Sequence, residues 1–227
     1  MRFANATLPD GSRHDIEVEG GRISALRPAS GAAHAAAPDT VDLGGTLVLP
    51  PLVDGHIHLD KTLLGLPWLP NQSAGNKVSD RIEAERRVRA ARTVPEFETG
   101  SNLVRQVVAS GTLHMRSHVD IDEESRLGHV EKLLALREEM AGRIDIQLVA
   151  FPQSGILRTP GVEDWLDAAL SLGCDAVGGL DPSLIDRDPV RHLDIVFKAG
   201  VAGSHRLDRH RRHGCRRRRD RGRRRRQ

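Results

Sequence analysis

The sequence predicts an α/β fold with a parallel sheet, and two patterns in the chain of 227 residues support this prediction. From about residue 46 onward, short apolar runs alternate with longer segments of helical periodicity, which is typical of βαβ units. Before that point, residues 9–11 (Pro-Asp-Gly) and 19–21 (Glu-Gly-Gly) are turn sequences between short polar–apolar alternations. A small antiparallel β segment over residues 1–48 is therefore expected to precede the α/β region.

Four β/α units are expected within residues 49–200. Strands are predicted at about 46–53, 112–118, 145–151 and 175–180. Helices are predicted at about 79–92, 95–109 and 125–140, then over the apolar period that begins at Val162 with Thr159 as a candidate cap, and finally from near Asp188 to Gly200. A complete (β/α)8 barrel usually needs about 250 residues, so these roughly 150 residues predict the N-terminal half of a TIM-type barrel.

The chain changes character after Gly200. Residues 203–227 contain 13 Arg and 2 Asp and show no hydrophobic period, and such a segment cannot bury enough apolar surface to fold. Without these residues, the totals of 34 basic and 31 acidic side chains leave residues 1–202 with a net charge of −8. We expect residues 201–227 to be a disordered Arg-rich tail. Because it begins where a fifth strand is due, it favours a shifted reading frame and a truncated barrel over a native basic arm.

Cysteine content and hydropathy indicate the compartment. Cys174 and Cys215 are the two cysteines of the chain, and they do not form a disulfide framework. No apolar run reaches transmembrane length, and the N-terminus lacks a secretory pattern. A cytoplasmic protein without a membrane partner is therefore expected.

Residues 52–61 (Leu-Val-Asp-Gly-His-Ile-His-Leu-Asp-Lys) contain the strongest functional signal. His56 and His58 are spaced by one residue, so in a strand both imidazoles face the same way. Histidine nitrogen is a common ligand of Zn and Fe, and two imidazoles at a strand end can bind one ion. The alternative is a polar pair that merely ends a strand. We expect His56 and His58 to be metal ligands, because an apolar run and an Asp-Gly turn precede them.

The run from Asp42 to Lys61 resembles the first barrel strand of the amidohydrolase superfamily, and most closely its cytosine deaminase and N-isopropylammelide amidohydrolase branch. The resemblance covers roughly residues 1–198. Three further segments carry it: Arg116-Ser117-His118-Val119-Asp120, Val149-Ala150-Phe151-Pro152-Gln153 and Val177-Gly178-Gly179-Leu180-Asp181-Pro182. It implies a β-sandwich built from both chain ends and wrapped on a (β/α)8 barrel, with residues 1–48 as a sandwich segment.

The resemblance also implies one divalent metal ion, Fe or Zn, which activates water for attack on a ring carbon that bears an amino group. His56 and His58 match the family's strand-one ligands. The family's further His and Asp ligands and its proton-transferring Glu and His come from strands five, six and eight, and no residue matches them. We therefore assign no catalytic residue, leave His205, His210 and His213 unassigned, and expect little or no activity from the present chain.

Other polar residues lie at predicted strand ends, where the active sites of (β/α)8 barrels form. The resemblance suggests Gln153 as a substrate contact, because its amide suits a pyrimidine or triazine edge; a satisfied loop glutamine is the alternative. His118, Asp120 and Asp181 are candidates to orient the metal ligands, against the alternative of structural support for the barrel mouth. For Lys61 we expect a surface or loop role.

The predicted function is hydrolytic deamination of a cyclic amidine by a metal-dependent, cytosine deaminase-like amidohydrolase with a small-molecule substrate. Specific nucleic-acid recognition is not expected, because the tail has no aromatic residues for base stacking. The alternative function is that of a non-catalytic protein whose Arg-rich tail binds nucleic acid phosphates non-specifically. The ring substrate, Fe versus Zn, and the oligomeric state, a homo-oligomer included, stay open.

Overall fold

The computed structural model of the protein describes residues 1–29, 38–70, 75–91 and 96–201. These residues fall into two compact units, which divide between Pro51 and Leu52. The predicted Arg-rich tail, apart from its first residue, and most of the Ala-rich stretch near residues 30–37 lie outside the described residues. Within the described residues, no helix combines the length and apolar character needed to cross a bilayer.

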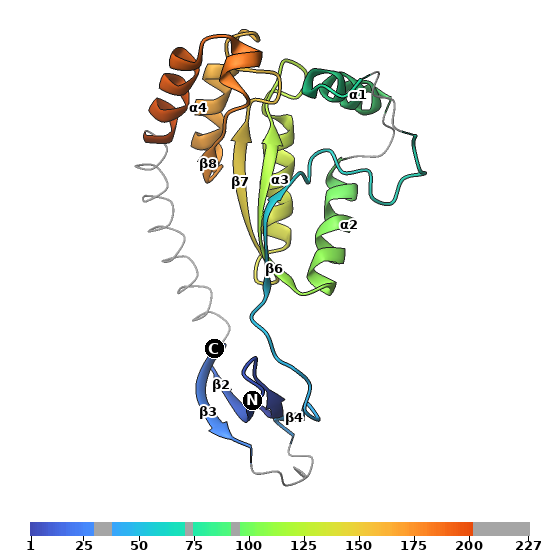
Figure 1. The fold of residues 1–227 in the computed structure, drawn as a ribbon, viewed down its shortest axis with the longest axis vertical. Helices are drawn as coiled ribbons and strands as arrows, with labels where there is room; N and C mark the ends of the chain where they lie inside the picture. The colour runs from blue at the N-terminus through green and yellow to red at the C-terminus, as the bar shows by residue number, and fades with distance from the viewer. Residues whose placement is uncertain (30–37, 71–74, 92–95, 202–227) are drawn as a thin grey trace, which may run out of the picture. The chain divides into compact units, whose positions relative to one another are not determined.

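The first unit is a four-stranded sheet with the strand order β3-β2-β1-β4 (Figure 1). Its strands are β1 (Arg2–Thr7), β2 (Arg13–Glu19), β3 (Arg22–Pro28) and β4 (Thr40–Asp42). β1 to β3 pair antiparallel, as the turn sequences predict, whereas β4 pairs with β1 in parallel. Gly20 and Gly21 make the turn between β2 and β3 with φ angles of 57° and 76°, a backbone region that glycine adopts without strain.

The second unit is a parallel sheet with the strand order β5-β6-β7-β8 and helices against it (Figure 1). Its strands are β5 (Leu52–Ile57), β6 (Thr112–Asp120), β7 (Asp145–Phe151) and β8 (Ala176–Val177). The helices that follow β5, β6 and β7 are α1 (Val78–Ala90), α2 (Glu96–Ala109), α3 (Gly128–Glu139) and α4 (Val162–Leu172). Residues 189–201 form a further helix after β8. The second unit therefore has the predicted alternation of strands and helices.

Three local predictions are wrong. The strand predicted at 46–53 begins at Leu52 instead, and Leu47 forms a bridge with Thr7 in the first unit. Two prolines at 50 and 51, which have no amide hydrogen to donate, separate the two pairings. β8 is shorter than predicted because Gly178 and Gly179, which weaken a strand, follow it. Thr159 does not cap α4: the N-cap is Gly161, with φ of 90° and no side-chain cap.

The core lies between the sheet and the helices. Along β6, Ser117 and Val119 are fully buried, whereas Arg116 is exposed and His118 half-buried. This alternation is the period-two pattern of a strand with one covered face. The buried apolar cluster draws on all the helices except α1, with Val104, Leu133, Leu136, Leu148 and Leu166 among its members. Polar side chains therefore occupy the other face of the sheet.

Arg126, on the loop after β6, lies over Trp165 of α4. The guanidinium carbon of Arg126 lies 5.6 Å from the ring centroid of Trp165, a distance at which a cation is attracted to the face of the ring. Trp165 itself packs partly buried against the core.

Candidate metal centre

Three histidines converge at the C-terminal ends of β5 and β6. His56 is inside β5, His58 follows it directly, and His118 is on β6, whose Ser117 pairs with Ile57 across the sheet. The rings of His56 and His118 stack with centroids 4.1 Å apart. The His58 ring centroid is 5.4 Å from that of His56 and 5.6 Å from that of His118. The parallel register therefore brings the expected ligand pair and the repeated His of the next strand together.

Two buried carboxylates lie beside this cluster. The Nδ1 atom of His58 is 3.7 Å from Oδ1 of Asp120 and 3.9 Å from Oδ1 of Asp60. One donor atom from each of these three residues lies within 4.8 Å of the others. Two ligands on one tetrahedral zinc with bonds of about 2.1 Å are about 3.4 Å apart. The donors are thus spaced closely enough to share one ion after small side-chain rotations.

The hydrogen-bonding state of these atoms supports a metal. Nδ1 of His58, Nδ1 of His118 and Oδ1 of Asp120 are buried and have no hydrogen-bond partner among the described residues. Buried polar atoms are normally paired, and a group without a partner in a native structure requires an explanation such as an ion. Imidazole nitrogen and carboxylate oxygen are the ligand types of catalytic Zn and Fe sites. The residues present therefore fit a divalent ion.

Burial and neighbouring cations keep His58 neutral. Burial, followed by the Lys61 ammonium, lowers the pKa of His58 to about 4, against the opposing effect of Asp60. Burial and the neighbouring His56 also lower the pKa of His118. A neutral imidazole has a free nitrogen lone pair, which is the form that binds a metal.

The two buried carboxyl groups beside His58 differ in their surroundings. Burial and the adjacent Asp60 raise the pKa of Asp120 to about 7, although Lys61 opposes this. Burial also acts to raise the pKa of Asp60, but the His129 imidazole, whose Nδ1 is 3.5 Å away, and the hydrogen bond from the Asp120 N–H hold it below its ordinary value. The pKa values of these two neighbouring carboxyl groups are therefore shifted in opposite directions. Such divergent pairs are characteristic of functional sites.

Lys61 lies in the loop after β5, as expected, but it is not on the surface, because it joins the cluster. Its side chain is only 19% exposed, and its Nζ lies 3.3 Å from Oδ2 of Asp120 and 3.1 Å from Oε2 of Glu85. Burial opposes the ammonium charge, but Asp120 and Glu85 raise the pKa of Lys61 above its ordinary value. Gln153 is also nearby, because its Nε2 donates to Oε2 of Glu85 over 3.4 Å.

Sequence reasoning assigned no role to Asp60, Glu85 or His129. Asp60 was within reach, because it repeats the i, i+2 spacing of His56 and His58. Glu85 and His129 come from helices that are distant in sequence, and no local pattern marks them. Asp181 is placed differently from the other candidates: it is exposed, and its carboxylate accepts from the N–H of Leu184 at the start of a short π-helical turn (Pro182–Asp186).

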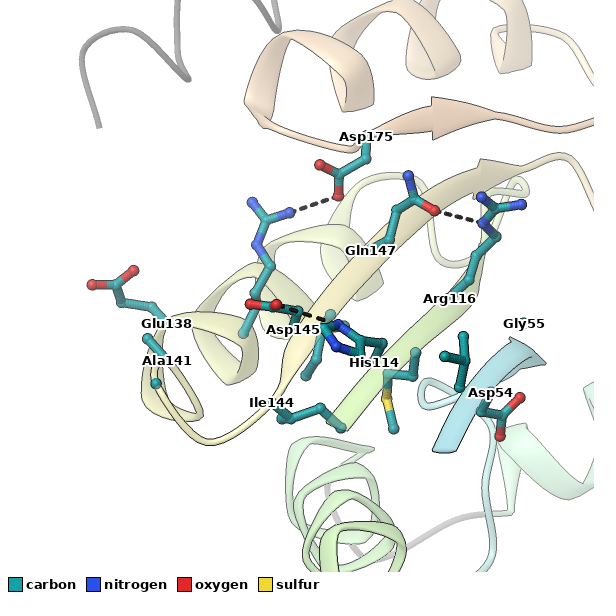
Figure 2. Close-up of a pocket in the computed structure, with 15 residues that line it drawn as sticks. Asp54, Gly55, His114, Arg116, Glu138, Ala141, Ile144, Asp145, Gln147 and Asp175 are labelled. Atoms are coloured by element: carbon teal, nitrogen blue, oxygen red, sulfur yellow. Dashed lines mark hydrogen bonds and ion pairs between the residues drawn. The ribbon is translucent and has the colours of Figure 1, made fainter. Parts of the chain in front are cut away.

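A hollow of about 780 Å³ lies at the N-terminal ends of the strands, opposite the histidine cluster (Figure 2). Several of its polar side chains are paired across neighbouring elements. His114 lies 3.3 Å from Asp145, Arg116 donates to Gln147 over 2.5 Å, and Arg137 pairs with Asp175 at 2.9 Å. The N-terminal face of a β/α barrel serves stability, whereas the C-terminal face holds the active site. The hollow therefore does not compete with the histidine cluster as the candidate site.

Comparisons with known proteins agree with the fold. The amidohydrolase family profile matches residues 39–173. The chain is 34% identical over 191 residues to the uncharacterized protein YahJ of Escherichia coli (strain K12), which covers 84% of this chain and 41% of that protein. It is 31% identical over 196 residues to N-isopropylammelide isopropyl amidohydrolase of Pseudomonas sp. (strain ADP), which covers 82% of this chain and 46% of that protein.

Solved structures give the same answer. N-isopropylammelide isopropylaminohydrolase from Burkholderia multivorans ATCC 17616 matches with a TM-score of 0.79 and 40% identity, over 89% of this chain and 50% of that chain. 5-Methylcytosine deaminase from Klebsiella pneumoniae, liganded with 5-fluorocytosine, matches with a TM-score of 0.76 and 28% identity, over 90% and 49% of the two chains. The chain spans about half the length of the relatives it matches. The predicted half-barrel is confirmed, and the chain belongs to the amidohydrolase family.

Proposed function

We propose that this chain provides the metal-binding part of a hydrolase that removes an amino or alkylamino group from a cyclic amidine, a pyrimidine or triazine ring. The observation that carries this proposal is the cluster of His56, His58 and His118 at the C-terminal strand ends, with Asp120 3.7 Å from His58. Membership of a metal-dependent family supports the chemistry. The names of two relatives, an N-isopropylammelide amidohydrolase and a 5-methylcytosine deaminase, support the ring class.

In this proposal His56 and His58 bind one divalent ion, iron or zinc, and His118 and Asp120 orient those ligands. The bound ion supplies a water that is nucleophilic at neutral pH. Asp120 lies 3.7 Å from Nδ1 of His58, where its carboxylate can orient that imidazole. Gln153 binds the polar edge of the ring through its amide. Asp181 has the more distant role of shaping the loop after β8.

None of the described residues is assigned to proton transfer with the substrate. We therefore propose that the chain binds the ion and the ring more readily than it turns the ring over. Action on a small molecule in the cytoplasm is part of the same proposal. The buried free thiol of Cys174 supports a reducing setting.

Metal analysis tests the proposal directly. After removal of metals with a chelator, zinc titration followed by calorimetry should show one ion per chain, and His58→Asn should weaken binding by at least about tenfold. His114→Asn is the matched control, because His114 is on β6 at the opposite end of the sheet and pairs with Asp145. Equal zinc affinity in wild type, His58→Asn and His114→Asn would reject the site.

Product analysis tests the ring class separately. Ammonia release from cytosine and isopropylamine release from N-isopropylammelide should both be measured with the metal-loaded chain. Slow release from one ring that disappears in the His56→Asn, His58→Asn double variant supports the proposal. Binding of neither ring, measured calorimetrically, contradicts the proposed substrate class even if zinc binds.

A further inference from the structure

Helix α1 contacts the site through one face. Residues 82, 85, 86 and 89 of this helix, spaced as i, i+3, i+4 and i+7, line a small hollow together with Lys61, Asp120 and Gln153. Arg86 donates to Ser154 over 2.5 Å, and Arg89 pairs with Asp122 at 2.8 Å. These contacts fix the register of the helix above the strand ends, so the position of Glu85 is defined by its neighbours.

Glu85 connects the two halves of the proposed site. Its Oε2 accepts from Nζ of Lys61 at 3.1 Å and from Nε2 of Gln153 at 3.4 Å. Lys61 in turn contacts Asp120, which is beside His58. A continuous polar path therefore runs from the proposed metal ligand to the proposed ring contact, and Glu85 is its only member on α1.

The backbone that carries Gln153 is fixed independently of Glu85. The N–H groups of Ile156 and Leu157 donate to the buried carboxylate of Asp186 at 2.9 and 3.1 Å. Asp186 is held in turn by Nδ1 of His192 at 2.6 Å, and both side chains are at most 1% exposed. The loop backbone is therefore held without Glu85, so replacing Glu85 should change the side chain of Gln153 and not its backbone.

A carboxylate fixes that rotation because it only accepts hydrogen bonds. An amide has a donating nitrogen on one side and an accepting oxygen on the other, and only the nitrogen can face Glu85. The hydrogen bond to Glu85 is the one that the Gln153 side chain makes among the described residues. Its Oε1 is left to accept from a ligand.

We propose that Glu85 is a positioning residue that sets Gln153 to accept, so that the site selects rings whose edge offers an N–H donor. The inference rests on the proposed function, because it takes Gln153 as the ring contact. A site built to pair with an N–H rejects an analogue that lacks it, because an acceptor covered by the bound ring would have no partner.

The test uses cytosine and 1-methylcytosine, which differ in one ring N–H. Binding of each to the zinc-loaded full chain is measured by calorimetry for wild type, Glu85→Ala and Glu85→Gln. The wild type should prefer cytosine by about tenfold or more, and both variants should reduce that preference to about threefold or less because the amide can then flip. Glu83→Gln is the matched control: Glu83 is on the same helix and its carboxylate pairs with Arg87 at 3.6 Å.

A second readout needs no ligand. The side-chain amide resonances of Gln153, identified by their loss in Gln153→Glu, should move in Glu85→Ala and stay in place in Glu83→Gln. Unchanged resonances, or an unchanged preference for cytosine in both Glu85 variants, overturn the inference while the proposed function stands. If wild type binds neither ring, the proposed substrate class fails and the inferred selectivity falls with it, whatever the resonances show.

Discussion

At the residue scale, buried charge beside the histidines is stabilised by specific neighbours. Asp60 accepts the N–H of Asp120 at 2.7 Å and lies 3.5 Å from Nδ1 of His129 on α3. The Lys61 ammonium stabilises the charged form of Asp120, whereas the neighbouring Asp60 carboxylate destabilises it. Because their neighbours differ, the two adjacent carboxylates have different pKa values. These neighbours come from β6, from α3 and from the segment after β5.

Cys174 gives a residue-scale prediction for pH. Burial raises the pKa of its thiol from 9.0 to about 12. The unfolded chain therefore loses this proton at lower pH than the folded chain, so stability is unaffected well below pH 9 and falls as pH rises from 9 towards 12. In a Cys215→Ser background, reaction of the remaining thiol with a disulfide reagent at pH 8 should follow unfolding by urea. Fast labelling of the folded protein would contradict burial.

The limits of sequence reasoning at this scale are visible in Lys61. The histidine pair could be recognised from sequence because residues i and i+2 of a strand lie on the same face. Whether a lysine beside it is on the surface depends on two partners, one 24 and one 59 residues away along the chain. Such contacts depend on tertiary packing, which no local pattern encodes.

At the element scale, α1 differs from the other helices because polar contacts hold it. Its one buried side chain is Ala84, whereas α3 buries His129, Val130, Leu133 and Leu136. Salt screens exposed ion pairs but leaves apolar burial intact. Raising NaCl from about 0.05 M to about 1 M should therefore speed amide hydrogen exchange in α1 and leave α3 unchanged. Equal acceleration in both helices, measured by mass spectrometry, would contradict this account.

Close packing of α2 gives a second element-scale prediction. A Cβ at Gly100 would lie 2.9 Å from the carbonyl oxygen of Leu59, next to Asp60. Backbone cannot move aside easily, so Gly100→Ala should lower the free energy of unfolding by about 1–3 kcal/mol. Gly128→Ala at the start of α3 is the control, because its added Cβ meets nothing within 4 Å. Urea unfolding measures both, and equal stabilities would refute the close approach.

Element boundaries show why part of the fold was predictable. β7 is predicted correctly at 145–151 because an apolar run there is bounded by a glycine turn and a loop. β5 is displaced because residues 46–49 are as apolar as a strand but pair in the first unit. An apolar run predicts that a segment is buried, but it does not predict which strand the segment pairs with.

At the scale of the whole molecule, the last described helix presents an apolar stripe. Val190, Leu193, Phe197 and Val201, spaced as i, i+3, i+7 and i+11, are between 43% and 70% exposed. Exposed stripes of this kind promote association. We expect sedimentation coefficients to rise with concentration from about 5 to about 200 µM, and Phe197→Ser to reduce the rise.

Lys198→Gln is the control for this prediction, because Lys198 is on the same helix and outside the stripe. Concentration-independent sedimentation of the wild-type chain would show that the stripe is covered in solution.

The half-barrel architecture itself was predictable from sequence, since the alternation of strand and helix is repeated four times. Which surface of the half-barrel stays exposed depends on which helix faces pack against the sheet, and the alternation of strands and helices does not show this.

The contact of Arg126 with Trp165 also gives the protein an intrinsic fluorescent probe. The chain has two tryptophans, and Trp68 is 83% exposed, so its emission changes little between the folded and unfolded states. Trp165 lies against the core beneath a guanidinium, and its fluorescence therefore responds when the loop after β6 leaves α4. Replacing Trp68 by Phe would leave a single emitter that reports, without any label, on the loop next to the histidine cluster.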